Sequence, residues 1–249
     1  MSSPDKDALV LEHREDGVVT LTLNRPRRRN ALSAALLEAL SEALIRVDQD
    51  DEARVIVLTG AGDKAFCAGG DLGSQMAGGG FLALHEGRGR FAGLIEQLLD
   101  LRKPTVARVQ ADCLGGGIGL MLACDLAVAA DGVRFGTPEI KVGLFPMMIM
   151  ALIFRNVGRK RAMEMMLTGE RFDAAEALSI GMLNRVAPAA ELDEAVGALA
   201  RWYMSSWSRA IFFMTLCLGA PVSRNCCFNC GYRWRTSQNS SSRTSWRGA

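Results

Sequence analysis

The sequence predicts a single α/β domain with a largely parallel sheet, on three observations. Residues 55–58 (VIVL) form a continuous apolar run, typical of a strand buried on both faces, and residues 105–109 and 126–130 are interpreted as further buried strands. Helical segments separate them, and strand–helix–strand connections of this kind join parallel strands. The chain of 249 residues is 49% hydrophobic with a net charge of +2, which supports one large core and excludes a disordered protein.

The elements that precede the first buried strand are a hairpin and a helix. Residues 18–23 alternate apolar residues with threonine, so we expect a strand that pairs with residues 8–12. Ser33 stands at the N-cap position of a helix whose apolar residues recur every three or four positions as far as Val47.

The elements that follow alternate in the same way. A helix is expected from about residue 88 to 101, before Pro104, and Gly115-Gly116-Gly117 opens another. From residue 160 to 200 the pattern turns helical, with glycines as breaks. Three cysteines in apolar surroundings are expected to be small core residues with free thiols: Cys67, Cys113 and Cys124.

Membrane and secreted proteins are not expected. The longest apolar run, residues 144–154, is shorter than the roughly 20 residues that a bilayer requires. The N-terminal residues are too charged for a signal peptide or a transit peptide. We therefore expect a cytoplasmic protein with no membrane partner.

The composition changes after Glu194, the last acidic residue. Residues 195–249 contain seven arginines, all four tryptophans and four of the seven cysteines. We expect a domain over residues 1–200 and an atypical basic tail, rich in Cys, Trp and Ser, over residues 201–249. Our hypothesis for this tail is a reading-frame shift in the source gene near residues 206–210. Cys227 and Cys230 have zinc-knuckle spacing without a second ligand pair, and the arginines are scattered, so we expect neither a metal nor a nucleic-acid partner.

Three glycine-bearing segments carry the candidate chemistry: residues 59–71 (TGAGDKAFCAGGD), 112–125 (DCLGGGIGLMLACD) and 135–146 (FGTPEIKVGLFP). The first imitates a dinucleotide-binding fingerprint, but that fingerprint opens a helix directly, whereas more glycine follows here. Two glycine-rich loops can instead aim backbone N–H groups at one oxygen and stabilise an enolate formed from a thioester. The alternative for the glycine triplet is a tight turn that permits close helix–sheet packing.

Five segments in order resemble the enoyl-CoA hydratase/isomerase (crotonase) superfamily. They are residues 24–33 (NRPRRRNALS), 55–72 (VIVLTGAGDKAFCAGGDL), 115–130 (GGGIGLMLACDLAVAA), 135–146 (FGTPEIKVGLFP) and 167–186 (LTGERFDAAEALSIGMLNRV). The likeness runs from about residue 9 to 188. It implies a crotonase-type spiral of ββα units with a helical C-terminal region, an acyl-CoA substrate and no further cofactor. It also implies a homotrimer or hexamer, provided that the C-terminal segment is intact.

The resemblance places an oxyanion hole at the backbone N–H groups of Gly70 and Gly116. Arg27 falls where the family has a residue near the CoA adenine and phosphate, and the alternative for it is a solvated basic turn. The other substrate-binding positions that the resemblance implies are Ala68, Gly69, Asp71 and Leu72.

The family's hydratases use two carboxylates, and this sequence keeps one of them, Glu139. The other position, three residues after the oxyanion glycine, is Gly119. One carboxylate is enough to move a proton on an enoyl thioester, as single-glutamate isomerases of the family do, whereas the syn addition of water requires two. We therefore predict an isomerase-like site in which apolar surroundings raise the pKa of the Glu139 base. The alternative for Glu139 is a capping or solvated glutamate.

Two other functions stay open. An enoyl-CoA hydratase would need a substitute second acid or base, for which His85 and Glu86 are the candidates, within a segment, residues 78–89, that we expect to be a mobile loop. A non-catalytic acyl-CoA- or RNA-binding relative would need no second acid or base. Replacing Gly119 by Glu is expected to add hydratase activity, unless a neighbour such as Met147 or Met148 fills the space.

Overall fold

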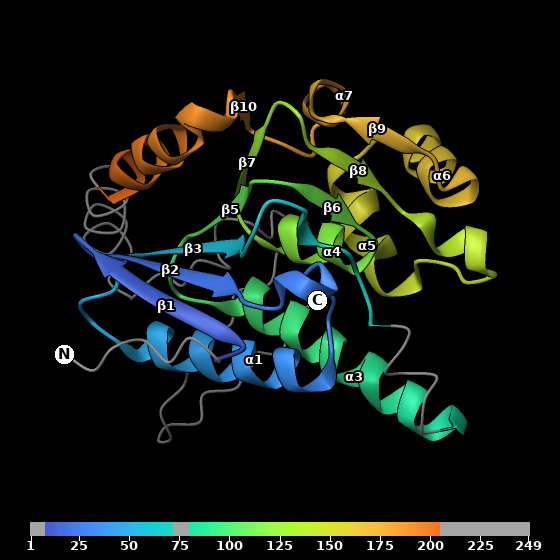
Figure 1. Cartoon of the computed structure of the whole chain (residues 1–249), viewed down its shortest axis with the longest axis horizontal. Coiled ribbons are helices and arrows are strands. Elements are labelled where there is room, and N and C mark those ends of the chain that lie inside the picture. The colour runs from blue at the N-terminus through green and yellow to red at the C-terminus, as the bar shows by residue number, and fades with distance from the viewer. Residues whose placement is uncertain (1–7, 72–79, 205–249) are drawn as a thin grey trace, which may run out of the picture.

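The computed structural model describes residues 8–71 and 80–204, which form two sheets (Figure 1). The larger sheet has the strand order β1 (Val10–Glu15), β2 (Val18–Leu23), β3 (Val55–Gly60), β5 (Thr105–Val109), β7 (Leu126–Ala130) and β10 (Arg185–Ala187). The smaller has the order β4 (Ala65–Cys67), β6 (Asp112–Leu114), β8 (Arg134–Gly136) and β9 (Arg171–Asp173). Only the β1–β2 and β8–β9 pairs within these two sheets are antiparallel, so the predicted class, an α/β domain with a largely parallel sheet, is confirmed.

A ββα unit repeats along the chain. β3 and β4 precede α3 (Gly80–Asp100), β5 and β6 precede α4 (Gly116–Ala123), and β7 and β8 precede α5 (Met147–Asn156). In each unit the first strand joins the larger sheet and the second joins the smaller one, beside its counterpart from the previous unit. This is the spiral that the resemblance implied, and it brings the loops after β4 and β6 to the same region of the molecule.

The N-terminal elements follow the sequence pattern closely. β1 pairs with β2 as the expected hairpin but continues to Glu15, beyond the predicted end. In α1 (Ala34–Gln49) Ser33 is the N-cap, and its Oγ accepts a hydrogen bond from the Leu36 N–H at 3.3 Å. The apolar stripe of α1 is buried, and each fully buried leucine contributes about 1.5–3 kcal/mol to the free energy of unfolding. α1 and α3 lie side by side under the larger sheet (Figure 1), joined by a hydrogen bond from Ser41 to Gln97 of 2.7 Å.

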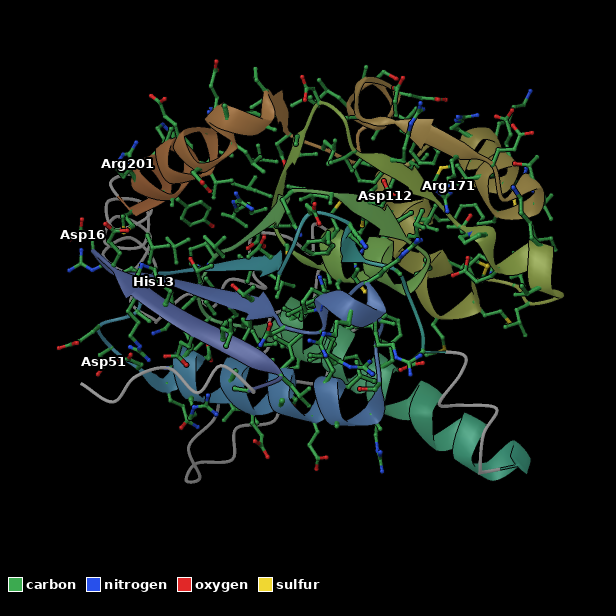
Figure 2. All side chains as sticks on the ribbon, in the orientation of Figure 1. His13, Asp16, Asp51, Asp112, Arg171 and Arg201 are labelled. Carbon is green, nitrogen blue, oxygen red and sulfur yellow. The ribbon has the colours of Figure 1, made fainter. Side chains whose placement is uncertain are left out.

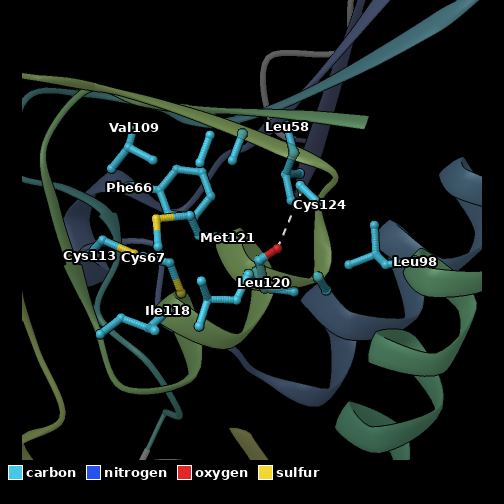
Figure 3. Packing of buried hydrophobic residues seen from close by; sticks show 14 of the residues in the cluster. Leu58, Phe66, Cys67, Leu98, Val109, Cys113, Ile118, Leu120, Met121 and Cys124 are labelled. Carbon is cyan, nitrogen blue, oxygen red and sulfur yellow. Dashed lines mark hydrogen bonds between the residues drawn. The ribbon is translucent and has the colours of Figure 1, made fainter. Parts of the chain in front are cut away.

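α4 is the most deeply buried helix in the described part of the chain. Every residue after its first is buried, which a helix with apolar residues on all sides requires. Around it lie the three cysteines that the sequence predicts to be core residues, all buried with free thiols (Figure 3). Burial raises the pKa of the Cys67 thiol to about 12, so it stays protonated at neutral pH.

The expected helical C-terminal region is confirmed, with two short strands in it that the sequence did not predict. α6 (Arg159–Thr168), α7 (Ala174–Ser179) and a helix over residues 192–204 are present, but β9 and β10 interrupt them. β9 pairs with β8, and the side chains of Arg171 and Asp112 approach to 3.5 Å across the smaller sheet (Figure 2). Three-residue strands carry too little alternation to be recognised from sequence.

The expectation of a loop over residues 78–89 is wrong for the described residues, because α3 begins at Gly80, eight residues before the predicted start. A Cβ on Gly87, Gly89 or Gly93 would meet nothing within 4 Å, so these glycines are not required by close packing. The helix tolerates them at about 1 kcal/mol each. Residues 78 and 79 lie outside the described part, as does the predicted tail from residue 205 onward.

Candidate active site

The amino end of α4 lies against the loop that follows β4. Gly69 has a φ of +90°, and a Cβ there would lie 3.1 Å from the backbone nitrogen of Gly116. A Cβ on Gly117 would lie 2.4 Å from the carbonyl oxygen of Cys67. Only glycine permits these approaches, so the triplet does serve close packing, the alternative considered for it from sequence. The same packing brings the two glycine-rich loops together.

Leu32 holds the loop after β4 from one side. Its N–H donates to the Gly69 carbonyl at 2.8 Å, and its carbonyl accepts from the Asp71 N–H at 3.1 Å. In such a parallel bridge the residue between the two bonded groups, Gly70, directs its own N–H away from Leu32. Gly116 is the first residue of α4, so its N–H has no partner within the helix. Both predicted oxyanion donors therefore lie outside the regular backbone hydrogen bonding of this region.

Glu139 lies on a 3₁₀ helix, η2 (Pro138–Val142), that follows β8 directly. Its Oε1 is 2.7 Å from the place that a Cβ on Gly115 would take, so the carboxyl lies against the turn that opens α4. Its Oε2 is buried and has no hydrogen-bond partner among the described residues. Burial raises the pKa of Glu139, and its own backbone N–H lowers it to a smaller extent. The side chain caps no helix end here and is only partly exposed, unlike a capping or solvated glutamate.

Side chains from two other helices occupy the space beside Gly119 of α4. A Cβ on Gly119 would lie 2.3 Å from Cγ2 of Ile149, in α5, and 3.2 Å from Cζ of Phe91, in α3. Both side chains are nearly or fully buried. The expectation that Met147 or Met148 might occupy this space is corrected: Ile149 occupies it, while Met147 is 67% exposed.

The loop with the predicted CoA-binding arginine is anchored by a buried asparagine. Asn30 donates from Nδ2 to the carbonyls of Ala61 and Ala65, and its Oδ1 accepts from the Arg25 N–H. The Arg25 guanidinium lies 3.0 Å from the Asp71 carboxylate, which ties this loop to the one after β4. Arg27 is exposed on a 3₁₀ helix, η1 (Pro26–Arg28).

The remaining predicted residues fall into three groups. Ala68 and Asp71 lie in the loop after β4, where the Asp71 carboxylate braces Arg25. Leu72 lies outside the described residues. Positions 85 and 86 lie within α3, the helix that also carries Phe91.

Sequence reasoning missed the residues that pack around these glycines: Leu32, Phe91 and Ile149. None carries a polar group, and although Leu32 lies in the recognisable segment 24–33, nothing in the sequence marks Phe91 or Ile149. Within the described residues there is no cluster of three or more His, Cys, Asp or Glu side chains that could hold a metal ion. No helix in that part of the chain is long and apolar enough to span a membrane.

Comparison with known proteins gives a consistent picture. The family model described as enoyl-CoA hydratase/isomerase matches residues 13–226. A protein of Rhizobium meliloti described as a probable enoyl-CoA hydratase is 40% identical over 195 residues, which cover 76% of this chain and 73% of that protein. A 4-chlorobenzoyl coenzyme A dehalogenase of Arthrobacter sp. is 38% identical over 205 residues, covering 81% and 74%. The crystal structure of an enoyl-CoA hydratase from Mycobacterium smegmatis superposes with a TM-score of 0.78 at 37% identity, covering 84% of each chain.

Proposed function

Because the chain belongs to the enoyl-CoA hydratase/isomerase family, we propose that it moves a proton along the acyl chain of an enoyl-CoA thioester, with Glu139 as the single acid/base. The observation that carries this proposal is the buried, unpartnered Oε2 of Glu139 beside the amino end of α4. A carboxylate oxygen that has no hydrogen-bond partner among the described residues is available to exchange a proton with a bound substrate.

The oxyanion hole in this proposal is formed by the N–H groups of Gly70 and Gly116. The thioester oxygen accepts from both, and negative charge develops on it when Glu139 removes a proton from C2 of a 3-enoyl group. The positive end of the α4 dipole stabilises that charge further. Glu139 then returns the proton to C4, the double bond moves to C2–C3, and no atom is gained or lost. One such hydrogen-bond donor is worth about 10²–10³ in rate.

The substrate-binding residues of this proposal lie on the two loops that Asn30 and Leu32 hold together. Arg27, being exposed and basic, would contact the CoA adenine and phosphate. Gly69, Asp71 and Ala68 would shape the loop around the thioester, and Leu72 follows them in the sequence. No cofactor other than the CoA of the substrate is proposed.

The test compares 3-enoyl-CoA and 2-enoyl-CoA as substrates for the wild type, Glu139→Gln and a matched control, Glu38→Gln. Glu38 is exposed on α1, so its substitution should leave both activities unchanged. Glu139→Gln should lower the isomerisation rate by about 10²–10⁴ while acyl-CoA still binds, since the amide keeps the shape but accepts no proton. A wild type that hydrates 2-enoyl-CoA rapidly, at a rate that Glu139→Gln leaves intact, would contradict the proposal.

Hydration of a 2-enoyl-CoA is the second candidate, because relatives are described as probable enoyl-CoA hydratases. It requires a second acid or base, for which His85 and Glu86 remain the candidates. Both positions lie within α3. If Glu139 is the single acid/base, His85→Ala and Glu86→Gln should leave the wild-type activities unchanged, and a hydratase rate abolished by either would favour this second function. A protein with neither activity that still binds acyl-CoA or RNA would match the non-catalytic alternative.

We further propose that the chain is cytoplasmic and that, provided its C-terminal segment is intact, it self-associates as a homotrimer or hexamer. Sedimentation of the full chain tests the second statement, and a stable monomer would indicate a damaged C-terminal segment. The family match reaches residue 226 and thus extends past residues 206–210, where a reading-frame shift is hypothesised. Retranslation of the source DNA in the other two frames tests that hypothesis. It fails if neither frame encodes an acid-containing amphipathic helix.

A further inference from the structure

The space beside Gly119 is closed by a rigid part of its neighbour. The atom 2.3 Å from the Cβ position is Cγ2 of Ile149, and Cβ of Ile149 itself is 3.3 Å away. A methyl group on a β-branched carbon cannot move aside by turning a terminal bond, because its position is set by χ1. Ile149 is 1% exposed, so its other rotamers would enter packed core.

Glu139 and Ile149 contact the same end of α4. The Glu139 carboxyl lies against Gly115, the N-cap of the helix, and Ile149 lies against Gly119, four residues further along the chain. Phe91 contacts the positions of both Gly116 and Gly119, and Leu32 contacts that of Gly116. Among the described residues, the side chains that contact the Gly116 and Gly119 positions are therefore apolar, and α4 itself carries no polar side chain that could hold a water molecule there.

From this packing, and resting on the proposed function, we propose that Ile149 is a specificity-determining residue: its side chain replaces the space for a second carboxylate and for the water of hydration. With no room for that water, the enolate intermediate is reprotonated at C4, and water is not added. While isoleucine is at position 149, no side chain fits at position 119, so Ile149 itself requires glycine there.

The experiment measures hydration of 2-enoyl-CoA and isomerisation of 3-enoyl-CoA in Gly119→Glu, alone and combined with Ile149→Ala. The double variant should hydrate 2-enoyl-CoA at least about 10²-fold faster than the wild type, the lower bound for one added acid/base group. Gly119→Glu alone should gain little, because its side chain has no room. The matched control combines Gly119→Glu with Ile153→Ala, which removes the same atoms from a buried residue one turn further along α5.

Two results would overturn the proposal. One is a double variant that is folded, binds acyl-CoA and isomerises 3-enoyl-CoA, but does not hydrate. The other is equal hydration by Gly119→Glu alone or by the Ile153→Ala control. Failure of the proposed function is a separate outcome, since it is read from Glu139→Gln in an otherwise wild-type chain.

A second measurement keeps the proposal testable if the Glu variants do not fold. Gly119→Ala should lower the Tm of the wild type and do so much less in the Ile149→Ala background, whereas the Ile153→Ala background should give no such relief. Equal losses in all three backgrounds would show that Ile149 does not close position 119.

Discussion

Replacing Asn30 gives a prediction whose size follows from its contacts. The side chain is fully buried and makes three hydrogen bonds: to the carbonyls of Ala61 at 3.0 Å and Ala65 at 2.8 Å, and from the Arg25 N–H at 3.0 Å. Its backbone is left-handed, with a φ of +52°. At about 1 kcal/mol for each hydrogen bond and about 1 kcal/mol for alanine in this conformation, Asn30→Ala should lower the free energy of unfolding by about 3–5 kcal/mol.

A second variant separates the two contributions. Asn30→Gly loses the same hydrogen bonds but adopts the left-handed backbone without strain, so it should be more stable than Asn30→Ala by about 1 kcal/mol. The control is Asn156→Ala, whose exposed side chain makes one hydrogen bond to the carbonyl of Leu152 in its own helix. Its cost should stay below about 1 kcal/mol.

Urea unfolding followed by far-ultraviolet circular dichroism measures all three variants, with the midpoint converted through the slope m. Because Asn30 positions the loop that leads to Leu32 and Gly69, the folded Asn30→Gly enzyme should also show a raised KM for acyl-CoA. The reasoning is refuted if Asn30→Ala costs no more than Asn156→Ala. It is refuted in part if the glycine and alanine variants are equally stable.

Three further outcomes are expected. Because burial raises the pKa of Glu139, ionising it costs stability. The Tm of Glu139→Gln relative to the wild type should therefore be constant below pH 4.5, rise between pH 4.5 and the raised pKa, and stay constant above it; a difference in Tm that does not change with pH would contradict this. With a pKa of about 12, Cys67 should remain unalkylated by iodoacetamide at pH 8 in the native protein, and peptide mapping by mass spectrometry detects any adduct. Gly117→Ala, whose Cβ would lie 2.4 Å from the Cys67 carbonyl, should lower the Tm well below that of Gly132→Ala, where a Cβ meets nothing within 4 Å.

The sequence marks the proposed catalytic residues more clearly than the residues that pack around them. Glu139, Gly70 and Gly116 lie in segments whose spacing is recognisable, and the buried strands of the larger sheet are marked by apolar runs. The short strands of the smaller sheet have only three residues each, too few for a period. Their pairing comes from the tertiary arrangement of the ββα units.

The neighbour of Gly119 shows why packing partners escape prediction. Residues 147–154 (MMIMALIF) are apolar on every side, so the sequence does not say which face of α5 points inward. The structure sets that phase: Ile149 is 1% exposed and Met147 is 67% exposed. The prediction that Met147 or Met148 fills the space beside Gly119 was therefore wrong by one or two positions. The uniformly apolar composition of α5 does not show which of its faces is buried.

The contact between Gly119 and Ile149 also restricts the order in which such a chain can evolve. Any side chain at position 119 meets the isoleucine methyl first, so a mutation there is selected against before its chemistry matters. Shrinking residue 149 opens a void that costs some stability but leaves the base and the backbone donors unchanged. A path from this chain to a variant with an acidic residue at position 119 is therefore expected to pass first through a smaller residue at position 149.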